Sequence, residues 1–152
     1  MSVCVKLQRV AMIGALALCP GAIAAPANAA SAASDYTAAQ AARGAQTYDR
    51  VCATCHGSNL EGKAGPPLTG KAFQDTLQYA KMTTSQLYAF ISQSMPQNAP
   101  GSLSGEQYVD VLGFLLSKNG YPAGSIPLSK QRLGGIVLLP FPGADGSIAA
   151  RH

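Results

Sequence analysis

The chain has 152 residues, a length suited to one small domain rather than to a catalytic domain joined to a second domain. Eleven Lys and Arg residues face seven Asp and Glu residues, and no basic cluster interleaved with aromatic residues is present, which argues against nucleic-acid binding. The seven carboxylates are scattered and no catalytic acid, base or nucleophile arrangement is apparent. The composition and residue pattern therefore give no sign of a nucleic-acid-binding surface or of a catalytic constellation.

Residues 1–30 are predicted to be a secretory signal peptide. They combine two early positive charges, an apolar run over residues 10–18 that is too short to span a bilayer, and small residues at 27–29 for cleavage. A membrane anchor would need a longer apolar run, and a lipoprotein signal at Cys19 is disfavoured by the bulky leucine before it. We therefore expect a periplasmic mature chain without a transmembrane anchor.

Three later segments carry helix signals, because each begins with a Ser or Thr followed three residues later by Gln, a capping box. These pairs are Thr37 with Gln40, Thr83 with Gln86, and Ser104 with Gln107. A glycine- and proline-rich loop, Gly57 to Gly70, follows the first predicted helix and shows no strand pattern. The third helix is expected to end at Asn119-Gly120. The predicted class is all-α, with short helices and long loops.

Apolar residues recur at helical spacing on the second and third predicted helices. Packing in the core is the default interpretation for them. They are Leu87, Phe90, Ile91, Val111 and Phe114.

The first predicted helix leads into Cys52-Ala53-Thr54-Cys55-His56, the attachment signature of c-type haem. Residues three apart share a helix face, so both thiols can reach one edge of a flat macrocycle, while the adjacent imidazole ligates the iron. A thioredoxin-like dithiol would belong to a strand-helix-strand unit, and structural zinc would need a second Cys or His pair. A disulfide would leave His56 unexplained. We therefore predict one covalent haem c, held by Cys52 and Cys55 with His56 as iron ligand.

The sixth iron ligand has two methionine candidates outside the signal peptide. Met95 is followed by Pro96 after the second predicted helix, so a loop can carry its thioether to the distal face of the haem. Met82 lies just before a helix start, where core packing is the simpler account, and His152 is the last residue of the chain. Met95 is the preferred ligand, and an open or water-bound iron is the alternative.

These motifs, in this order, resemble the class I cytochromes c over residues 37–124. Gly44 and Tyr48 look like the small and aromatic residues that pack on the last helix of that family, where Val111 and Phe114 match the receiving positions. The resemblance implies the class I cytochrome c fold, built around one haem.

Gly65-Pro66-Pro67-Leu68 resembles the family's loop whose proline carbonyl accepts a hydrogen bond from the proximal imidazole. The resemblance therefore implies that Pro66 and Leu68 join the two cysteines, His56 and Met95 in the haem site.

A narrower resemblance links the chain to bacterial periplasmic cytochromes associated with quinoprotein dehydrogenases. It rests on Leu60-Glu61-Gly62, on residues 95–104 and on residues 119–124. Many of these relatives carry a tryptophan that contacts a haem propionate, whereas this chain has no Trp. The resemblance implies redox partner proteins, namely a dehydrogenase as donor and a terminal oxidase or another cytochrome as acceptor.

The predicted function follows from the ligand set. Iron held by His and Met cannot bind substrate without losing a ligand, so single-electron transfer is expected. The alternative is a haem protein with an exchangeable sixth site that binds gases or acts as a weak peroxidase.

The predicted organisation is a signal peptide, a cytochrome domain over residues 31–124 and a C-terminal extension over residues 125–152. The extension contains a short apolar run near Leu138 and has two interpretations. It either wraps the domain and covers apolar surface, or forms an exposed arm that docks on a partner.

Overall fold

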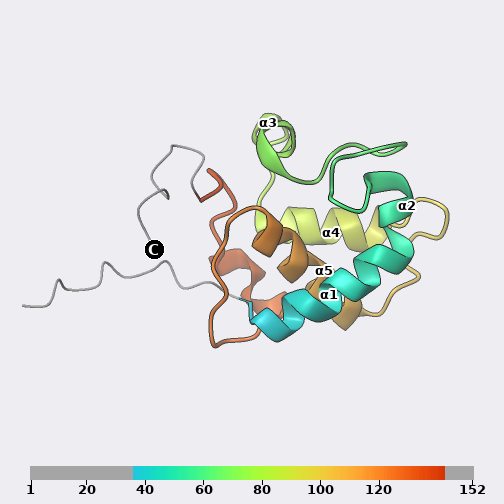
Figure 1. The fold of residues 1–152 in the computed structure, drawn as a ribbon. Coiled ribbons are helices and arrows are strands. Elements are labelled where there is room, and N and C mark those ends of the chain that lie inside the picture. Colours follow the sequence, from blue (N-terminus) through green and yellow to red (C-terminus); the bar gives the residue numbers. More distant parts are fainter. Residues whose placement is uncertain (1–35, 143–152) are drawn as a thin grey trace, which may run out of the picture.

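The structure is a computed structural model that describes residues 36–142, which form helices and loops (Figure 1). The elements in chain order are α1 (Ala38–Val51), α2 (Ala53–His56), α3 (Gly70–Tyr79), α4 (Thr84–Ser94), α5 (Gly105–Lys118) and the 3-10 helix η1 (Lys130–Gly135). No strand occurs within residues 36–142, which confirms the all-α class. In the same range no helix is long and apolar enough to cross a membrane. The predicted signal peptide, residues 1–30, and His152 lie outside the described residues.

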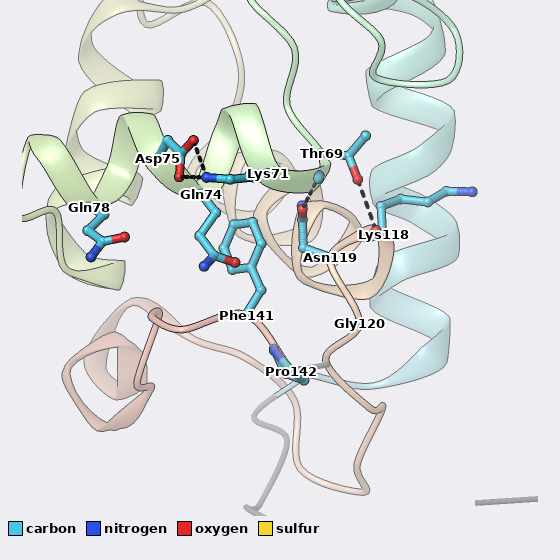
Figure 2. A pocket seen from close by; sticks show the side chains of 11 residues that line it. Thr69, Lys71, Gln74, Asp75, Gln78, Lys118, Asn119, Gly120, Phe141 and Pro142 are labelled. Atoms are coloured by element: carbon cyan, nitrogen blue, oxygen red, sulfur yellow. Dashed lines mark hydrogen bonds and ion pairs between the residues drawn. The ribbon is translucent and has the colours of Figure 1, made fainter. Parts of the chain in front are cut away.

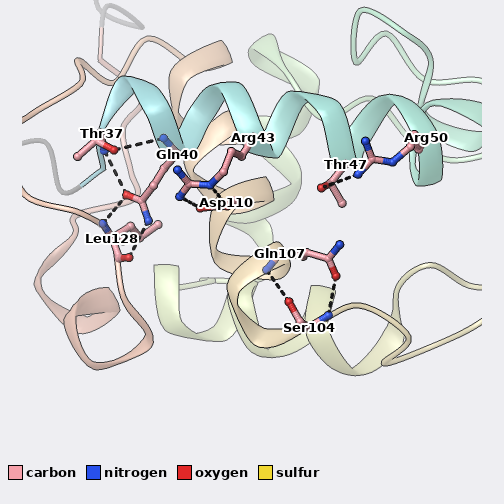
Figure 3. A network of polar contacts seen from close by, with 9 residues as sticks. All are labelled: Thr37, Gln40, Arg43, Thr47, Arg50, Ser104, Gln107, Asp110 and Leu128. Carbon is pink, nitrogen blue, oxygen red and sulfur yellow. Dashed lines mark hydrogen bonds and ion pairs between the residues drawn. The ribbon is translucent and has the colours of Figure 1, made fainter.

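The three predicted helix starts are confirmed. Helices α1, α4 and α5 each begin with a complete capping box, in which the cap hydroxyl accepts from the third backbone amide and the Gln side chain accepts from the cap amide. Figure 3 shows two of them, at Thr37 with Gln40 and at Ser104 with Gln107. These contacts involve residues three apart, so the local sequence is sufficient to specify them.

Helices α1 and α5 form the central pair of the fold. A Cβ atom at Gly44 would lie 1.9 Å from the backbone oxygen of Asp110. The backbones of the two helices therefore approach so closely here that only glycine fits. One turn further on, the rings of Tyr48 and Phe114 pack with centroids 5.2 Å apart. The packing implied by the cytochrome resemblance is therefore present.

A paired charge reinforces the α1–α5 contact (Figure 3). The Arg43 guanidinium donates two hydrogen bonds to the Asp110 carboxylate, at 2.7 and 2.8 Å. This bidentate geometry fixes the rotation of one helix against the other as well as their separation.

Helix α3 was not predicted from the sequence. Its cap residue, Thr69, makes no side-chain capping bond, because the Thr69 hydroxyl instead donates to the backbone oxygen of Lys118 at 3.2 Å. The helix is held by two buried residues, Phe73 and Leu77, and a pocket of about 550 Å³ lies between α3, the end of α5 and Phe141 (Figure 2). Tertiary contacts rather than a local capping signal therefore define α3.

The segment after α5 packs into the core. Four of its apolar side chains are 2–6% exposed within the larger hydrophobic cluster: Leu128, Leu133, Leu138 and Phe141. The wrapping interpretation of the extension thus holds for its described part, up to residue 142. The proposed division of the chain at residue 124 remains a prediction.

Two sets of hydrogen bonds tie the extension to the helices. Leu128 accepts from Nε2 of Gln40 at 2.8 Å and donates to Oε1 of Gln40 at 2.6 Å, so the Gln40 side chain serves both the α1 cap and the extension (Figure 3). The Thr84 hydroxyl at the start of α4 donates to the backbone oxygen of Ile136 at 2.9 Å. The extension therefore bridges the starts of α1 and α4.

The predicted core position of Phe90 is wrong. Its side chain is 47% exposed, whereas Leu87 is 5% exposed and Ile91 is partly buried against the core. Residues 84, 87, 88 and 91 share one side of α4, and position 90 lies on the flank of that side. Helical spacing alone placed Phe90 too close to the buried face.

Candidate haem-binding site

The two cysteines and the histidine lie at the junction of α1 and α2. The backbone amide of Cys52 still donates to Tyr48 at the end of α1, and the carbonyl of Cys52 accepts from the amide of His56 at 2.9 Å, which closes the short turn of α2. Cys52 is partly buried, and Cys55 is exposed. The helical turn therefore places both thiols and the imidazole within one short peptide, as the motif predicts.

His56 has a defined partner. Its Nδ1 atom lies 2.8 Å from the backbone oxygen of Pro66. A carbonyl oxygen only accepts hydrogen bonds, so Nδ1 is the donor in this contact and Nε2 is the ring nitrogen that the contact leaves unused. This is the contact implied by the cytochrome resemblance, and it leaves Nε2 as the ring nitrogen available to a metal.

Gly65 makes room for the imidazole ring. A Cβ atom at Gly65 would lie 2.8 Å from Cε1 and 3.0 Å from Nδ1 of His56. The same loop is held to α2 because the amides of Gly65 and Lys63 both donate to the carbonyl of Cys55, at 2.8 and 3.1 Å. The loop and the ligand-bearing turn are thus one hydrogen-bonded unit.

The turn after His56 is fixed from two sides. The buried Tyr48 hydroxyl donates to the carbonyl of Gly57 at 2.6 Å, and burial is the largest cause that raises the pKa of Tyr48 to about 12. The hydroxyl is therefore a protonated donor at neutral pH. A Cβ atom on Gly57 would lie 2.2 Å from Oε2 of Glu61, so the Glu61 carboxylate occupies that space. The carboxylate also accepts a hydrogen bond from the amide of Asn59 at 2.8 Å.

Leu68 joins the loop to the core. Its partly buried side chain packs against both hydrophobic clusters, its amide donates to Leu60 at 2.9 Å, and its carbonyl accepts from Nδ2 of Asn119 at 3.0 Å. Leu68 thereby anchors the end of the loop that carries Pro66. Contact of Leu68 with a haem stays a prediction.

The two methionine candidates lie in different environments. Met95 is the C-cap of α4, with extended backbone and a partly buried side chain, and its carbonyl accepts a hydrogen bond from the Tyr108 hydroxyl at 2.6 Å. Met82 packs against the larger core cluster. Met82 thus has the packing role expected for it, and Met95 lies at the end of α4, where the backbone changes from helical to extended.

The rival interpretations of the Cys-x-x-Cys pair receive no support. Burial, with a smaller contribution from the neighbouring Cys55, raises the pKa of the Cys52 thiol to about 11. A redox dithiol needs the opposite, a thiolate stabilised at neutral pH. Within residues 36–142, no group of three or more His, Cys, Asp or Glu side chains is arranged to hold a metal ion.

The donor set fits haem c. Covalent attachment and axial ligation require two free thiols three residues apart, an imidazole oriented through Nδ1, and space around its ring, which Gly65 leaves. Cys52 and Cys55 would hold the porphyrin edge, and His56 would face the iron. The all-helical fold and this site define a c-type cytochrome domain.

Comparison with known families makes the assignment specific. The family described as "Cytochrome C oxidase, cbb3-type, subunit III" matches residues 39–115, about half of the chain. The protein belongs to this cytochrome c family. The matched range extends from the first turn of α1 to the buried part of α5, so it includes every predicted site residue.

Two relatives are dehydrogenases by name. Thiosulfate dehydrogenase of Stutzerimonas stutzeri (strain A1501) is 39% identical over an alignment of 83 residues that covers 50% of this chain and 26% of that protein. The crystal structure of the sulfane dehydrogenase SoxCD from Paracoccus pantotrophus superposes with a TM-score of 0.51 at 26% identity, over 70% of this chain and 55% of that one. The chain therefore spans about a quarter of the length of the thiosulfate dehydrogenase and about half of the SoxCD chain. Neither name supports the expected association with quinoprotein dehydrogenases.

Three contributors to the site were not predicted from the sequence: Tyr108, which bonds the Met95 carbonyl, Glu61, which packs over Gly57, and the hydroxyl of Tyr48. Tyr48 was expected only to pack on the last helix, and no role was predicted for Tyr108. The available signal was the presence of a hydroxyl on an otherwise apolar stripe, because a buried tyrosine hydroxyl needs a hydrogen-bond partner.

Proposed function

We propose that this protein is a periplasmic monohaem cytochrome that carries single electrons, with His56 and Met95 as the two axial ligands. The observation that carries the proposal is the 2.8 Å contact between Nδ1 of His56 and the Pro66 oxygen. It orients the imidazole and leaves Nε2 free to bind a metal, and it raises the basicity of that nitrogen.

Bound haem supplies a reversible one-electron Fe(III)/Fe(II) couple. The chain's own contribution is to fix the two axial side chains and to limit access of water. If His56 and Met95 both hold the iron, a substrate would have no place on the metal, and partners would exchange electrons through a small, transient docking surface. Cys52, Gly65 and residues 97–99 are the proposed surroundings of that surface.

The proposed donor is a dehydrogenase of inorganic sulfur compounds. Its support is the similarity to proteins named thiosulfate dehydrogenase and sulfane dehydrogenase. The proposed role is that of a separate carrier or of the cytochrome subunit of a dehydrogenase complex. A terminal oxidase or another cytochrome is the proposed acceptor.

Axial ligation is tested by near-infrared spectroscopy of the ferric holoprotein, where a methionine–iron bond gives a charge-transfer band. We expect the band in the wild type and in Met82→Ala, and its loss in Met95→Ala. Met82 is the matched control because its side chain packs in the core. A wild type without the band, or with added imidazole binding as in an open-site protein, would instead support the gas-binding or peroxidase alternative.

The donor class is tested by following reduction of the ferric holoprotein in extracts of the native organism. Thiosulfate is added to one sample and ethanol, a substrate type of quinoprotein dehydrogenases, to another. Faster reduction with thiosulfate supports the proposed donor. If only ethanol speeds the reduction, the donor would instead be a quinoprotein dehydrogenase.

Export is tested with the full chain and with a chain that starts at residue 31. We expect covalent haem in the periplasmic fraction only when residues 1–30 are present. Equal haem attachment in both would contradict the proposed location.

A further inference from the structure

The loop that follows Met95 is closed at its base by one side chain. Tyr108, from the second turn of α5, donates its hydroxyl proton to the Met95 carbonyl at 2.6 Å and accepts from the amide of Leu103 at 3.4 Å. Met95 begins the loop and Leu103 ends it. A single hydroxyl therefore joins the two ends of the segment that would carry the distal ligand.

The loop has few other restraints. Residues 97–102 are all exposed, and their hydrogen bonds are short-range turns, from Ala99 to Pro96 at 2.9 Å and from Ser102 to Ala99 at 3.3 Å. The amide of Gly101 also reaches the Met95 carbonyl, but at 3.4 Å. A segment with little buried surface and local bonds only is expected to open easily.

Tyr108, by contrast, is firmly placed. Its side chain is 4% exposed within the larger hydrophobic cluster, and its amide bonds to the cap residue Ser104 at 3.1 Å. Leu103 precedes the cap of α5 and Tyr108 is the fourth residue of that helix, which are the positions of a hydrophobic staple. The ring is thus fixed by the helix start, and its hydroxyl points back to the loop.

We propose that Tyr108 is a positioning residue that holds the loop from Met95 to Leu103 closed and thereby keeps the Met95 thioether in place. The proposal rests on the proposed ligation by Met95. Removing the hydroxyl leaves the Met95 carbonyl with its long bond to Gly101 and leaves the Leu103 amide without this partner. The loop then opens more often, and the thioether leaves its position more often.

The test compares the holoproteins Tyr108→Phe and Tyr121→Phe. Tyr121 is a matched control, since its hydroxyl also bonds backbone carbonyls, those of Leu138 and Val137 in the extension. The measurement is the rate at which added imidazole binds the ferric haem, which is limited by release of the protein ligand. We expect an increase of about three- to tenfold in Tyr108→Phe, the size set by loss of one buried hydrogen bond, and a change below about twofold in Tyr121→Phe.

The outcomes separate this inference from the proposed function. Equal rates in the two variants, with a wild-type methionine–iron band that Met95→Ala abolishes, overturn the role of Tyr108 and leave ligation intact. Absence of that band in the wild type overturns the ligation and this inference with it.

A second measurement needs no variant. In the wild-type holoprotein, the Leu103 amide should exchange its hydrogen at least about tenfold more slowly than the Asn98 amide, which makes no hydrogen bond within the described part of the chain. Equal exchange would show that the hydroxyl does not close the loop.

Discussion

Gly65 lies so close to the ring of His56 that a Cβ atom on it would be 2.8 Å from Cε1. Real Cβ atoms do not approach this closely, and the neighbouring atoms belong to a ring already fixed by the Pro66 oxygen at 2.8 Å. The absence of a side chain at position 65 and the orientation of the proposed proximal ligand are therefore one structural feature.

Gly65→Ala should raise the reduction potential of the holoprotein. The added methyl group displaces the ring or the loop, weakens the bond to Pro66 and lowers the basicity of Nε2, which disfavours the ferric state. Loss of about 1 kcal/mol of hydrogen-bond energy corresponds to roughly 40 mV for one electron. A spectroelectrochemical titration measures this, with Gly134→Ala as control, because a Cβ atom there meets nothing within 4 Å. Equal shifts in both variants would contradict the prediction.

Gly44→Ala should destabilise the fold by at least about 3 kcal/mol, because its Cβ atom would lie 1.9 Å from the backbone oxygen of Asp110 and the central helices would have to separate. Urea unfolding of the holoprotein checks this value. Gly113→Ala is the control on α5, where the nearest atom, Cβ of Tyr36, is 3.5 Å away. That change should be neutral or stabilising by up to about 1 kcal/mol, since alanine is the better helix former. Similar losses in both variants would argue against the close approach.

Leu138→Ala should lower the free energy of unfolding by about 2–5 kcal/mol, because it removes a side chain that is 5% exposed in the core. Val137→Ala, at a side chain that is 76% exposed, should change it by less than about 0.5 kcal/mol. Thermal or urea unfolding compares these neighbours in the extension. If both variants behave like the wild type, the extension contributes nothing to the stability of the domain, and removal after residue 124 should then also be tolerated.

Glu61 should contribute to acid sensitivity. Hydrogen bonds from the backbone amides of Glu61 itself and of Asn59 lower the pKa of its carboxyl below the usual 4.5. A carboxyl with a lowered folded-state pKa adds stability above about pH 4.5, and this stability is lost as pH falls through the lowered value. The unfolding free energy of Glu61→Gln should therefore fall less steeply with acidification below that pH than the wild-type value does. Urea unfolding at several pH values measures this difference. Parallel curves for the two proteins across this range would show that Glu61 does not contribute to acid sensitivity.

How much the sequence could predict depended on how local each interaction is. The three capping boxes, the Cys-x-x-Cys-His turn and the Pro66 contact involve residues at most ten apart. Their partners can be identified from spacing or from a motif. Helix α3 was missed because its start is held by the end of α5, through bonds from Thr69 to Lys118 and from Gly70 to Asn119.

Positions on a helix face were harder to rank. Leu87 and Phe90 carry equivalent signals in a periodic pattern, yet one is buried and the other is half exposed. Which apolar side chains of a helix become buried depends on the elements that pack against it. Helix α4 is contacted by α5 and η1, and their positions are not contained in the sequence of α4.

The sequence by itself determined the class of the protein: an all-α chain with a haem attachment motif and a candidate distal methionine. Only the tertiary structure decided that the described part of the extension belongs to the core and that Tyr108 closes the Met95 loop. The reason is the range of the contacts. A helix cap or a ligand motif is completed within a few residues, whereas the bonds from Gln40 to Leu128 and from Tyr108 to Met95 exist only after separate segments have packed together.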